Sequence, residues 1–203
     1  MAEKKYTPMM QHYLKMKEEN PDAILFYRLG DFYEMFFEDA KLVSQELDLV
    51  LTGRSAGVEE KVPMCGVPFH AANSYIQRLV KKGYKVAICE QLEDPSSAKG
   101  LVDRGIIKII TPGTYMDATM DAKSTNYMAS CEISSFEITV IYCELSTGEL
   151  KYQTLQRSLV SLQKALLEQN VSELVCPMTM DKKWMAALEE MDAMVISKHK
   201  KAN

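Results

Sequence analysis

The stretch DAILFYRLGDFYEMFFEDA, residues 22–40, joins an apolar run to a segment dense in aromatic and acidic side chains. The run DAILFYRLG predicts a short buried strand that ends at Gly30, because strands of this length are bounded by turn residues. The residues from Asp31 to Leu51 predict a helix, since apolar side chains recur there at helical spacing: Phe32, Met35, Phe36, Leu42, Val43 and Leu47. A strand followed by a helix favours an α/β fold.

The acidic and aromatic residues at the start of this predicted helix allow three interpretations. In the first, Asp31 is the N-cap, Glu34 completes a capping box, and Phe32 faces the core together with Phe36. In the second, Asp31, Glu34 and Glu38 share one helical face and hold a divalent metal ion for phosphodiester cleavage. In the third, Phe32 projects outward at the strand-to-helix corner as a recognition wedge, with Glu34 beside it.

Helical and strand signals alternate on both sides of this stretch. A helix is predicted from Thr7 to Asn20, with Thr7 as N-cap and Pro8 in the first helical position. A second helix is predicted over 70–82, ended by Gly83, and strands are predicted over 84–91 and 105–111. The glycines, serine and charges of residues 52–61, TGRSAGVEEK, predict a loop.

The second half of the chain is expected to form a separate α/β domain. Residues 115–127 are polar and lack periodicity, which predicts a linker. A hairpin follows with its turn at 146–148, and then helix, strand, helix and strand over 158–170, 172–177, 181–191 and 193–197. This order predicts a mixed sheet that becomes parallel, with helices on its faces. Because its last strand would be an edge unless more strands follow, this domain is expected to be incomplete.

The composition is that of an ordinary soluble globular protein. Hydrophobic residues make up 47% of the chain and charged residues 26%, values that argue against disorder. Five cysteines without a CxxC pair predict reduced thiols of a cytoplasmic protein, and no apolar run approaches membrane-spanning length. The net charge of −4 argues against a protein that is basic all over but permits a local basic site. Arg54 and Ser55, with the glycines around them, are the best candidates for binding a backbone phosphate.

Motifs for nucleotide chemistry and for a zinc protease are absent from the 203 residues. There is no GxxxxGK[ST] phosphate loop, no HExxH and no Rossmann glycine fingerprint. The chain is therefore predicted not to be an enzyme, with no catalytic residue, no metal site and no cofactor of its own. A metal-dependent nuclease stays open as an alternative, through Asp31, Glu34 and Glu38 or through Glu144 in the second domain.

Four blocks of sequence carry a resemblance to a known family. They are residues 7–40, 51–57 (LTGRSAG), 62–95 and 106–114 (IIKIITPGT). In this order and at this spacing they resemble the N-terminal mismatch-recognition domain of the MutS family of DNA mismatch-repair proteins, and residues 127–197 are similar to its connector domain. The resemblance implies an α/β protein with a mixed-sheet recognition domain flanked by helices over 1–116. It also implies a linker over 117–127 and an incomplete, ribonuclease H-like α/β connector domain over 128–203.

The resemblance implies roles for individual residues. The family's Phe-x-Glu motif falls on Phe32 and Glu34. In the family this phenylalanine enters the minor groove and stacks on the mispaired base, and the glutamate hydrogen-bonds a base at that site. The family's loop arginine and serine fall on Arg54 and Ser55, and an arginine before the isoleucine-rich strand falls on Arg104. These three residues are expected to contact the DNA backbone near the kink.

The resemblance also implies partners. They are double-stranded DNA with mismatches or small loops and, for the connector domain, downstream repair proteins. Relatives continue into a C-terminal ATPase and act as homodimers, so ATP, magnesium and a homodimer are expected only for a full-length protein. Two alternatives from other function classes remain, namely a protein-interaction module without DNA binding of its own and the metal-dependent nuclease.

Overall fold

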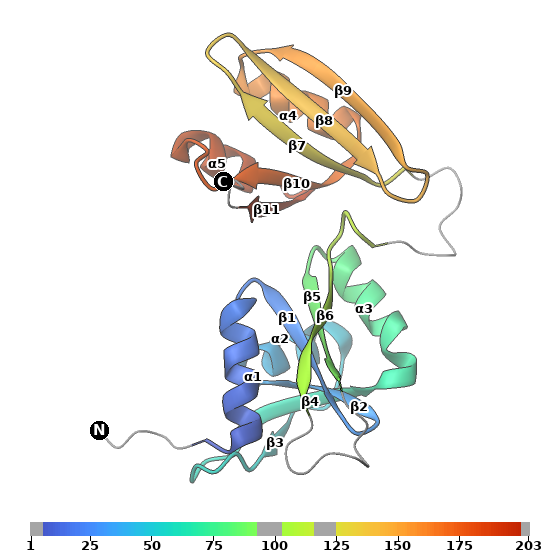
Figure 1. Ribbon diagram of the computed structural model, residues 1–203, viewed down its shortest axis with the longest axis vertical. Helices are drawn as coiled ribbons and strands as arrows, with labels where there is room; N and C mark the ends of the chain where they lie inside the picture. Colours follow the sequence, from blue (N-terminus) through green and yellow to red (C-terminus); the bar gives the residue numbers. More distant parts are fainter. Residues whose placement is uncertain (1–5, 93–102, 116–124, 200–203) are drawn as a thin grey trace. The chain divides into compact units, whose positions relative to one another are not determined.

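A computed structural model describes residues 6–92, 103–115 and 125–199 of the chain. The chain divides into two compact units, residues 1–110 and 111–203, each with its own sheet (Figure 1). Residues 117–124 of the predicted linker lie outside the described residues. In the part of the chain that the structure describes, no helix is both long and apolar enough to cross a membrane.

The first unit is built on a mixed sheet whose described strands number six. Its strands are β1 (Ala23–Leu29), β2 (Phe32–Phe36), β3 (Thr52–Arg54), β4 (Val62–Pro68), β5 (Lys85–Gln91) and β6 (Arg104–Ile110). Its helices are α1 (Pro8–Glu19), α2 (Phe37–Leu47) and α3 (Ala72–Lys81), with a short 3-10 turn, η1 (Phe69–Ala71), before α3. The strand order is β3-β4-β2-β1-β5-β6, in which β1 and β5 run parallel and the other neighbours antiparallel.

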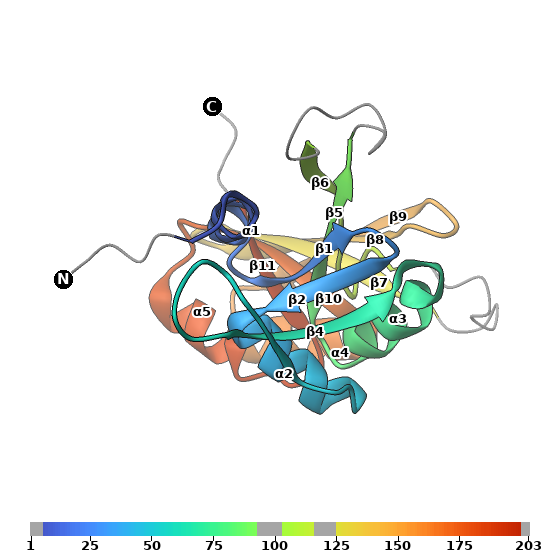
Figure 2. The same cartoon turned by 90° about the horizontal axis from the view of Figure 1, so that it is seen from below.

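Helices cover both faces of this sheet, with α1 on one side and α2 and α3 on the other (Figure 2). Because side chains alternate along a strand, each strand contributes to both cores. The α1 side contains Met10, Tyr13, Met16, Leu25, Tyr27 and Phe36. Thr7 caps α1 as predicted, since its Oγ1 accepts the N–H of Met10 at 3.4 Å, and Pro8 occupies the first helical position.

The predicted helix over 31–51 is wrong in its first part. Residues 32–36 form β2, which pairs with β1 on one side and with β4 on the other. α2 begins only at Phe37, whose φ of 55° turns the chain from strand directly into helix. Two-sided sheet pairing overrides the helical spacing here. Asp31 is consequently not an N-cap, Glu34 is not in a helix, and the capping-box prediction is wrong.

Three further strands were not predicted. β3 lies within the predicted loop over 52–61, and β4 fills a segment for which no element was predicted. β4 contains two prolines and a glycine, residue types that are depleted in strands and so conceal one. In the second unit, a strand begins at the last residue of the predicted linker, so the predicted order lacked its first strand.

The second unit is a five-stranded sheet with order β11-β10-β7-β8-β9 in the described residues. Its elements are β7 (Tyr127–Ile133), β8 (Glu137–Glu144), β9 (Glu149–Gln156), α4 (Leu159–Glu168), β10 (Val171–Pro177), α5 (Lys182–Glu189) and β11 (Val195–His199). β7, β8 and β9 are antiparallel, whereas β10 runs parallel to both β7 and β11. The predicted hairpin and the mixed sheet that becomes parallel are confirmed, and both units confirm the predicted α/β class.

Candidate nucleic-acid interface

A tight corner between β1 and β2 presents Phe32 at the end of the first sheet. Leu29 and Phe32 pair across the two-residue turn formed by Gly30 and Asp31. Gly30 has a φ of 57°, a left-handed conformation that favours glycine, and nothing lies within 4 Å of a Cβ built there. The backbone conformation, rather than lack of space, therefore requires glycine. The side chain that follows this turn, Phe32, is 44% exposed.

Phe32 and Glu34 lie on one face of β2, next to Gly66 of β4. Glu34 pairs with Gly66 and Phe32 pairs with Pro68 across the antiparallel strands. A Cβ at Gly66 would lie 3.5 Å from Glu34 Cγ and 3.6 Å from Phe32 Cδ1. Because Gly66 has no side chain, both residues can occupy the space above it. The structure thus brings the two predicted mismatch-binding residues together.

Arg54 lies on the same face of the sheet as Phe32 and Glu34, and it forms an ion pair with Glu34. Its Nη1 donates a hydrogen bond to Glu34 Oε2, and the two side chains are 38% and 17% exposed. The Arg54 guanidinium carbon also lies 6.0 Å from the ring centroid of Phe36. Ser55 follows directly after β3 and is exposed. Phe32, Glu34 and Arg54 therefore form a connected group, which we call the β2 face, with Ser55 adjacent in sequence.

Arg104 lies apart from the β2 face, on β6 at the opposite edge of the sheet from β3. Its side chain is buried, and its Nε donates to the Arg28 carbonyl oxygen at 2.9 Å. Its guanidinium carbon is 5.4 Å from the Tyr27 ring centroid. In this structure Arg104 supports the end of β1, so contact with a phosphate would require the side chain to move. Its expected contact with DNA stays a prediction.

A second exposed phenylalanine, Phe69, lies at the same corner and was not predicted as a site residue. Its N–H donates to the Asp31 carbonyl oxygen at 2.9 Å, and the residue is 41% exposed. Arg28 stacks on it, with the guanidinium carbon 3.7 Å from the ring centroid. The only sequence signal was an aromatic residue between Pro68 and a predicted helix, which does not distinguish a surface residue from a core residue.

The opposite face of β2 is held by a hydrogen-bonded group. The buried Tyr33 hydroxyl donates to Glu90 Oε1, and Arg28 Nη1 donates to the same oxygen at 3.2 Å. Burial, followed by the Glu90 hydrogen bond, raises the pKa of Tyr33 to about 12. Tyr33 therefore keeps its proton and its hydrogen bond at neutral pH, which fixes the strand that carries Phe32 and Glu34.

The acidic residues of the opening segment do not form the predicted metal-binding face. Asp31 lies in the turn before β2, Glu34 in β2 and Glu38 in α2, so the shared helical face is wrong. Glu34 is paired with Arg54, and Glu38 accepts from Lys41 at 2.6 Å. Among residues 6–92, 103–115 and 125–199, no group of three or more His, Cys, Asp or Glu side chains is placed to hold a metal ion.

Glu144, the other acid considered for a nuclease, accepts hydrogen bonds from residues of the hairpin turn that follows it. It is buried and accepts from the N–H and Oγ1 of Thr147 at 2.7 and 2.6 Å, and from Ser146 Oγ at 2.7 Å. The Thr147 hydroxyl, followed by the Ser146 hydroxyl, lowers the pKa of Glu144 to about 2. Its oxygens stabilise the turn and are not presented to a metal ion or a substrate.

The segment GRSAG, residues 53–57, fits the GxSxG pattern of a serine nucleophile, so a prediction that this pattern is absent from the chain is wrong. That pattern needs the serine on a turn from strand to helix. Ser55 instead follows the short edge strand β3, and the next regular element is strand β4. The required strand-turn-helix context is missing, so Ser55 is not placed as a nucleophile.

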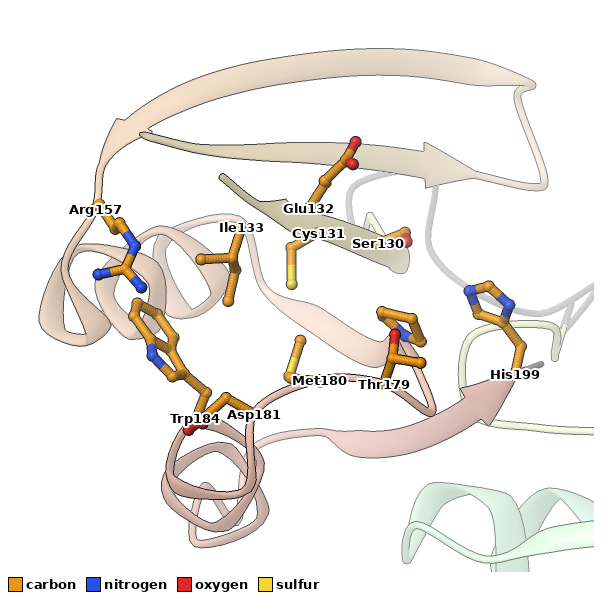
Figure 3. A pocket seen from close by; sticks show the side chains of 11 residues that line it. Ser130, Cys131, Glu132, Ile133, Arg157, Thr179, Met180, Asp181, Trp184 and His199 are labelled. Carbon is orange, nitrogen blue, oxygen red and sulfur yellow. The ribbon is translucent and has the colours of Figure 1, made fainter. Parts of the chain in front are cut away.

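A cavity of about 450 Å³ lies in the second unit, where β7 extends beyond its pairing with β10. Figure 3 shows the sulfur of Cys131 directed toward Met180, and Arg157 beside Trp184. The Arg157 guanidinium carbon is 5.9 Å from the Trp184 ring. The lining is mixed, since Ile133, Met180 and Trp184 are apolar whereas Glu132, Arg157 and Asp181 are charged.

Comparison with known proteins extends these observations. The family model for MutS domain I matches residues 7–119. The DNA mismatch repair protein MutS of Clostridium botulinum (strain Loch Maree / Type A3) is 61% identical over 144 residues, which cover 70% of this chain and 16% of that protein. The protein of the same name from Clostridium tetani is 58% identical over 146 residues, or 71% of this chain and 17% of that protein. The matched region thus spans about a sixth of these relatives.

Proposed function

The chain belongs to the MutS family, whose domain I model matches more than half of its residues, and from this premise we propose that its first unit recognises mispaired bases in double-stranded DNA. The observation that carries the proposal is the exposed Phe32 beside Glu34 on a sheet whose other face is fixed. DNA mismatch repair is the process for which the relatives are named.

Phe32 is proposed to act as a wedge in the minor groove. Proteins that bind this groove insert apolar side chains between base steps, and the DNA kinks in response. Unstacking needs the least free energy where base pairing is already defective. A fixed, exposed phenylalanine would therefore insert more readily at a mismatch or a small loop than in intact duplex.

Glu34 is proposed to add selectivity rather than affinity. A carboxylate near phosphates is repelled, which weakens binding to every duplex. A displaced base offers a hydrogen-bond donor that compensates this repulsion at a mismatch alone. Specificity then arises from a penalty on the wrong partner as well as from a contact with the right one.

The other predicted residues and partners are proposed to have roles that complement those of Phe32 and Glu34. Arg54 and Ser55 are proposed to contact the DNA backbone close to the wedge, and Arg104 after its side chain moves. Residues 128–203 are proposed to be the connector domain that contacts downstream repair proteins. ATP and magnesium are proposed only for a full-length protein, since no phosphate loop occurs in these 203 residues. A homodimer is likewise proposed only for a full-length protein.

A protein-interaction module without DNA binding of its own is a second candidate. It is supported by the cavity in the second unit, whose mixed apolar and charged lining could hold a side chain of a partner. This candidate assigns no role to Phe32 or Glu34 and therefore predicts that substituting either residue leaves binding of a protein partner unchanged.

One titration separates these functions. The purified chain is mixed at low salt with fluorescently labelled duplexes that are identical except for a single mismatch, and binding is followed by anisotropy with and without magnesium. The proposal expects weak binding that is tighter for the mismatched duplex and leaves the DNA uncut. Absence of binding to both duplexes would support the interaction module, equal binding to both would contradict mismatch recognition, and magnesium-dependent cleavage would support a nuclease.

A further inference from the structure

We propose that Arg54 is a specificity-determining residue that pairs with Glu34 in the free protein and exchanges this partner for a DNA phosphate only at a mismatch. This inference rests on the proposed mismatch recognition and adds to it. Arg54 would otherwise be an ordinary phosphate contact that strengthens binding to all DNA equally.

The strand order makes the pairing of Arg54 with Glu34 possible. β4 lies between β3 and β2, and its residue opposite Glu34 is Gly66. Arg54 pairs with Val62, two same-face positions along β4 from Gly66, so its side chain runs diagonally past the Phe36 ring to Glu34. Because Gly66 has no side chain, nothing at that position of β4 contacts the Glu34 side chain.

The exposure of the pair makes an exchange of partners feasible. The Arg54 side chain is 38% exposed and that of Glu34 17%, so water partly screens their attraction from the Arg54 side. Because the arginine is the more exposed partner, it can leave Glu34 without unfolding its surroundings. A phosphate oxygen offers the guanidinium an equivalent charge-assisted hydrogen bond. Moving Arg54 from Glu34 to DNA therefore requires little free energy from Arg54 itself.

The fate of Glu34 decides whether the exchange is favourable. Once Arg54 leaves, the Glu34 carboxylate is unpaired and close to phosphates, which is unfavourable. At a mismatch a displaced base can donate to it. In intact duplex the Watson–Crick donors are used between the bases, and an A·T pair presents only acceptors in the minor groove, so at an A·T site Glu34 keeps Arg54. The proposal therefore predicts one additional phosphate contact on mismatched DNA that intact DNA does not receive.

The salt dependence of DNA binding depends on the number of phosphates that the protein neutralises, so it tests whether Arg54 changes partner. Each phosphate that a cationic side chain neutralises steepens the plot of log binding constant against log salt by about 0.9. We would measure this slope with matched mismatched and intact duplexes for the unmodified chain, Arg54→Gln, Glu34→Gln and the double variant. Arg78→Gln, at an exposed arginine on α3, is the matched control for loss of a positive charge.

Three results are expected together. Arg54→Gln reduces the slope by about 0.9 on mismatched DNA and leaves it unchanged on intact DNA. Glu34→Gln releases Arg54, so binding to intact DNA becomes tighter and its slope steeper by about 0.9. In the double variant this steepening disappears. Arg78→Gln changes both slopes alike or neither.

Other outcomes overturn the inference in distinguishable ways. If Arg54→Gln lowers the slope equally on both duplexes, Arg54 is an ordinary phosphate contact. If it lowers neither slope, Arg54 only holds Glu34 and never reaches DNA. Both results leave mismatch recognition by Phe32 and Glu34 intact provided that the unmodified chain prefers the mismatch, although the second removes Arg54 from the proposed DNA contacts. If that preference is absent, the proposed function fails and the exchange fails with it.

Discussion

Phe32 and Phe36 stand at the two ends of β2 in opposite environments, 44% and 1% exposed respectively. The helical spacing in the sequence treats them as equivalent, because residues four apart share one face of a helix. They also share one face of the strand, but α1 packs on the Phe36 end, where the Tyr13 ring centroid lies 4.9 Å from that of Phe36. One residue therefore belongs to the core and the other to the surface.

This difference gives a prediction about stability. Phe36→Ala should lower the free energy of unfolding by about 3–5 kcal/mol, because it removes a large buried side chain and leaves a cavity. Phe32→Ala should lower it by about 1 kcal/mol or less, as for a surface residue. Denaturant unfolding of the two variants measures both values, and equal losses would show that Phe32 is a core residue.

The Glu144 turn gives a prediction about pH. The pKa of Glu144 is lowered to about 2 by the Thr147 and Ser146 hydroxyls, whereas the pKa of a glutamate in an unfolded chain is about 4.3. Because the folded pKa is the lower one, the stabilisation is complete above about pH 4.3 and is lost as the pH falls toward about 2.

The Glu144→Gln variant should lack this part of the pH dependence. Melting temperatures of the two proteins would be compared from neutral pH to about pH 2, the range that contains both pKa values. The gap between their melting temperatures should narrow as the pH falls. A gap that stays constant over this range would show that the turn does not lower the pKa of Glu144.

At the scale of the elements, strong local signals were predictable and sheet pairing was not. α1, α3, β1, β5 and the β8–β9 hairpin follow from capping, periodicity and turn residues. β2 and β4 depend on partners distant in sequence, and β4 is further concealed by Pro63, Gly66 and Pro68. The same pairing that sequence periodicity misses is what places Glu34 beside Phe32 and Gly66.

Gly66 is therefore expected to be essential to the β2 face. A Cβ there would lie 3.3 Å from the Tyr33 carbonyl oxygen, besides its contacts with Glu34 and Phe32. Gly66→Ala should destabilise the chain by about 1–3 kcal/mol, as overpacking does, and should reduce the preference for mismatched DNA by displacing both side chains.

Gly105→Ala is the matched control for this substitution. Gly105 also lies in a strand, but a Cβ there would lie 3.2 Å from the flexible end of Leu92. The preference of the Gly105→Ala variant for mismatched over intact DNA should be unchanged. The two variants would be compared by thermal unfolding and by anisotropy with both duplexes. An unchanged mismatch preference in a folded Gly66→Ala protein would show that the β2 face tolerates displacement.

At the scale of the whole molecule, the sequence resemblance supplied the candidate site residues and the structure supplied the contacts between them. The resemblance named Phe32, Glu34 and Arg54 separately, but the Arg54–Glu34 pair joins residues twenty positions apart and depends on the β3-β4-β2 order. It gave no sign that Arg104 is buried or that Phe69 is exposed. Such facts follow from tertiary packing, which no local pattern encodes.

The absence of a phosphate loop gives a prediction for the chain as a whole. The 203 residues contain no GxxxxGK[ST], so no glycine-rich loop is available to bind the phosphates of ATP. The purified chain should therefore release no phosphate from ATP above the buffer background, with or without DNA. Hydrolysis that copurifies with the chain through successive columns would contradict this prediction.

The most direct test of the central claim is the mismatch preference of Phe32→Ala. The ratio of dissociation constants for intact and mismatched duplex would be measured for the unmodified chain, for Phe32→Ala and for Phe136→Ala. Phe136 is the control because it is also a phenylalanine, is 89% exposed and lies in the second unit. The wedge account predicts that Phe32→Ala remains folded and binds both duplexes equally, while Phe136→Ala keeps the original ratio. An unchanged ratio in a folded Phe32→Ala protein would contradict it.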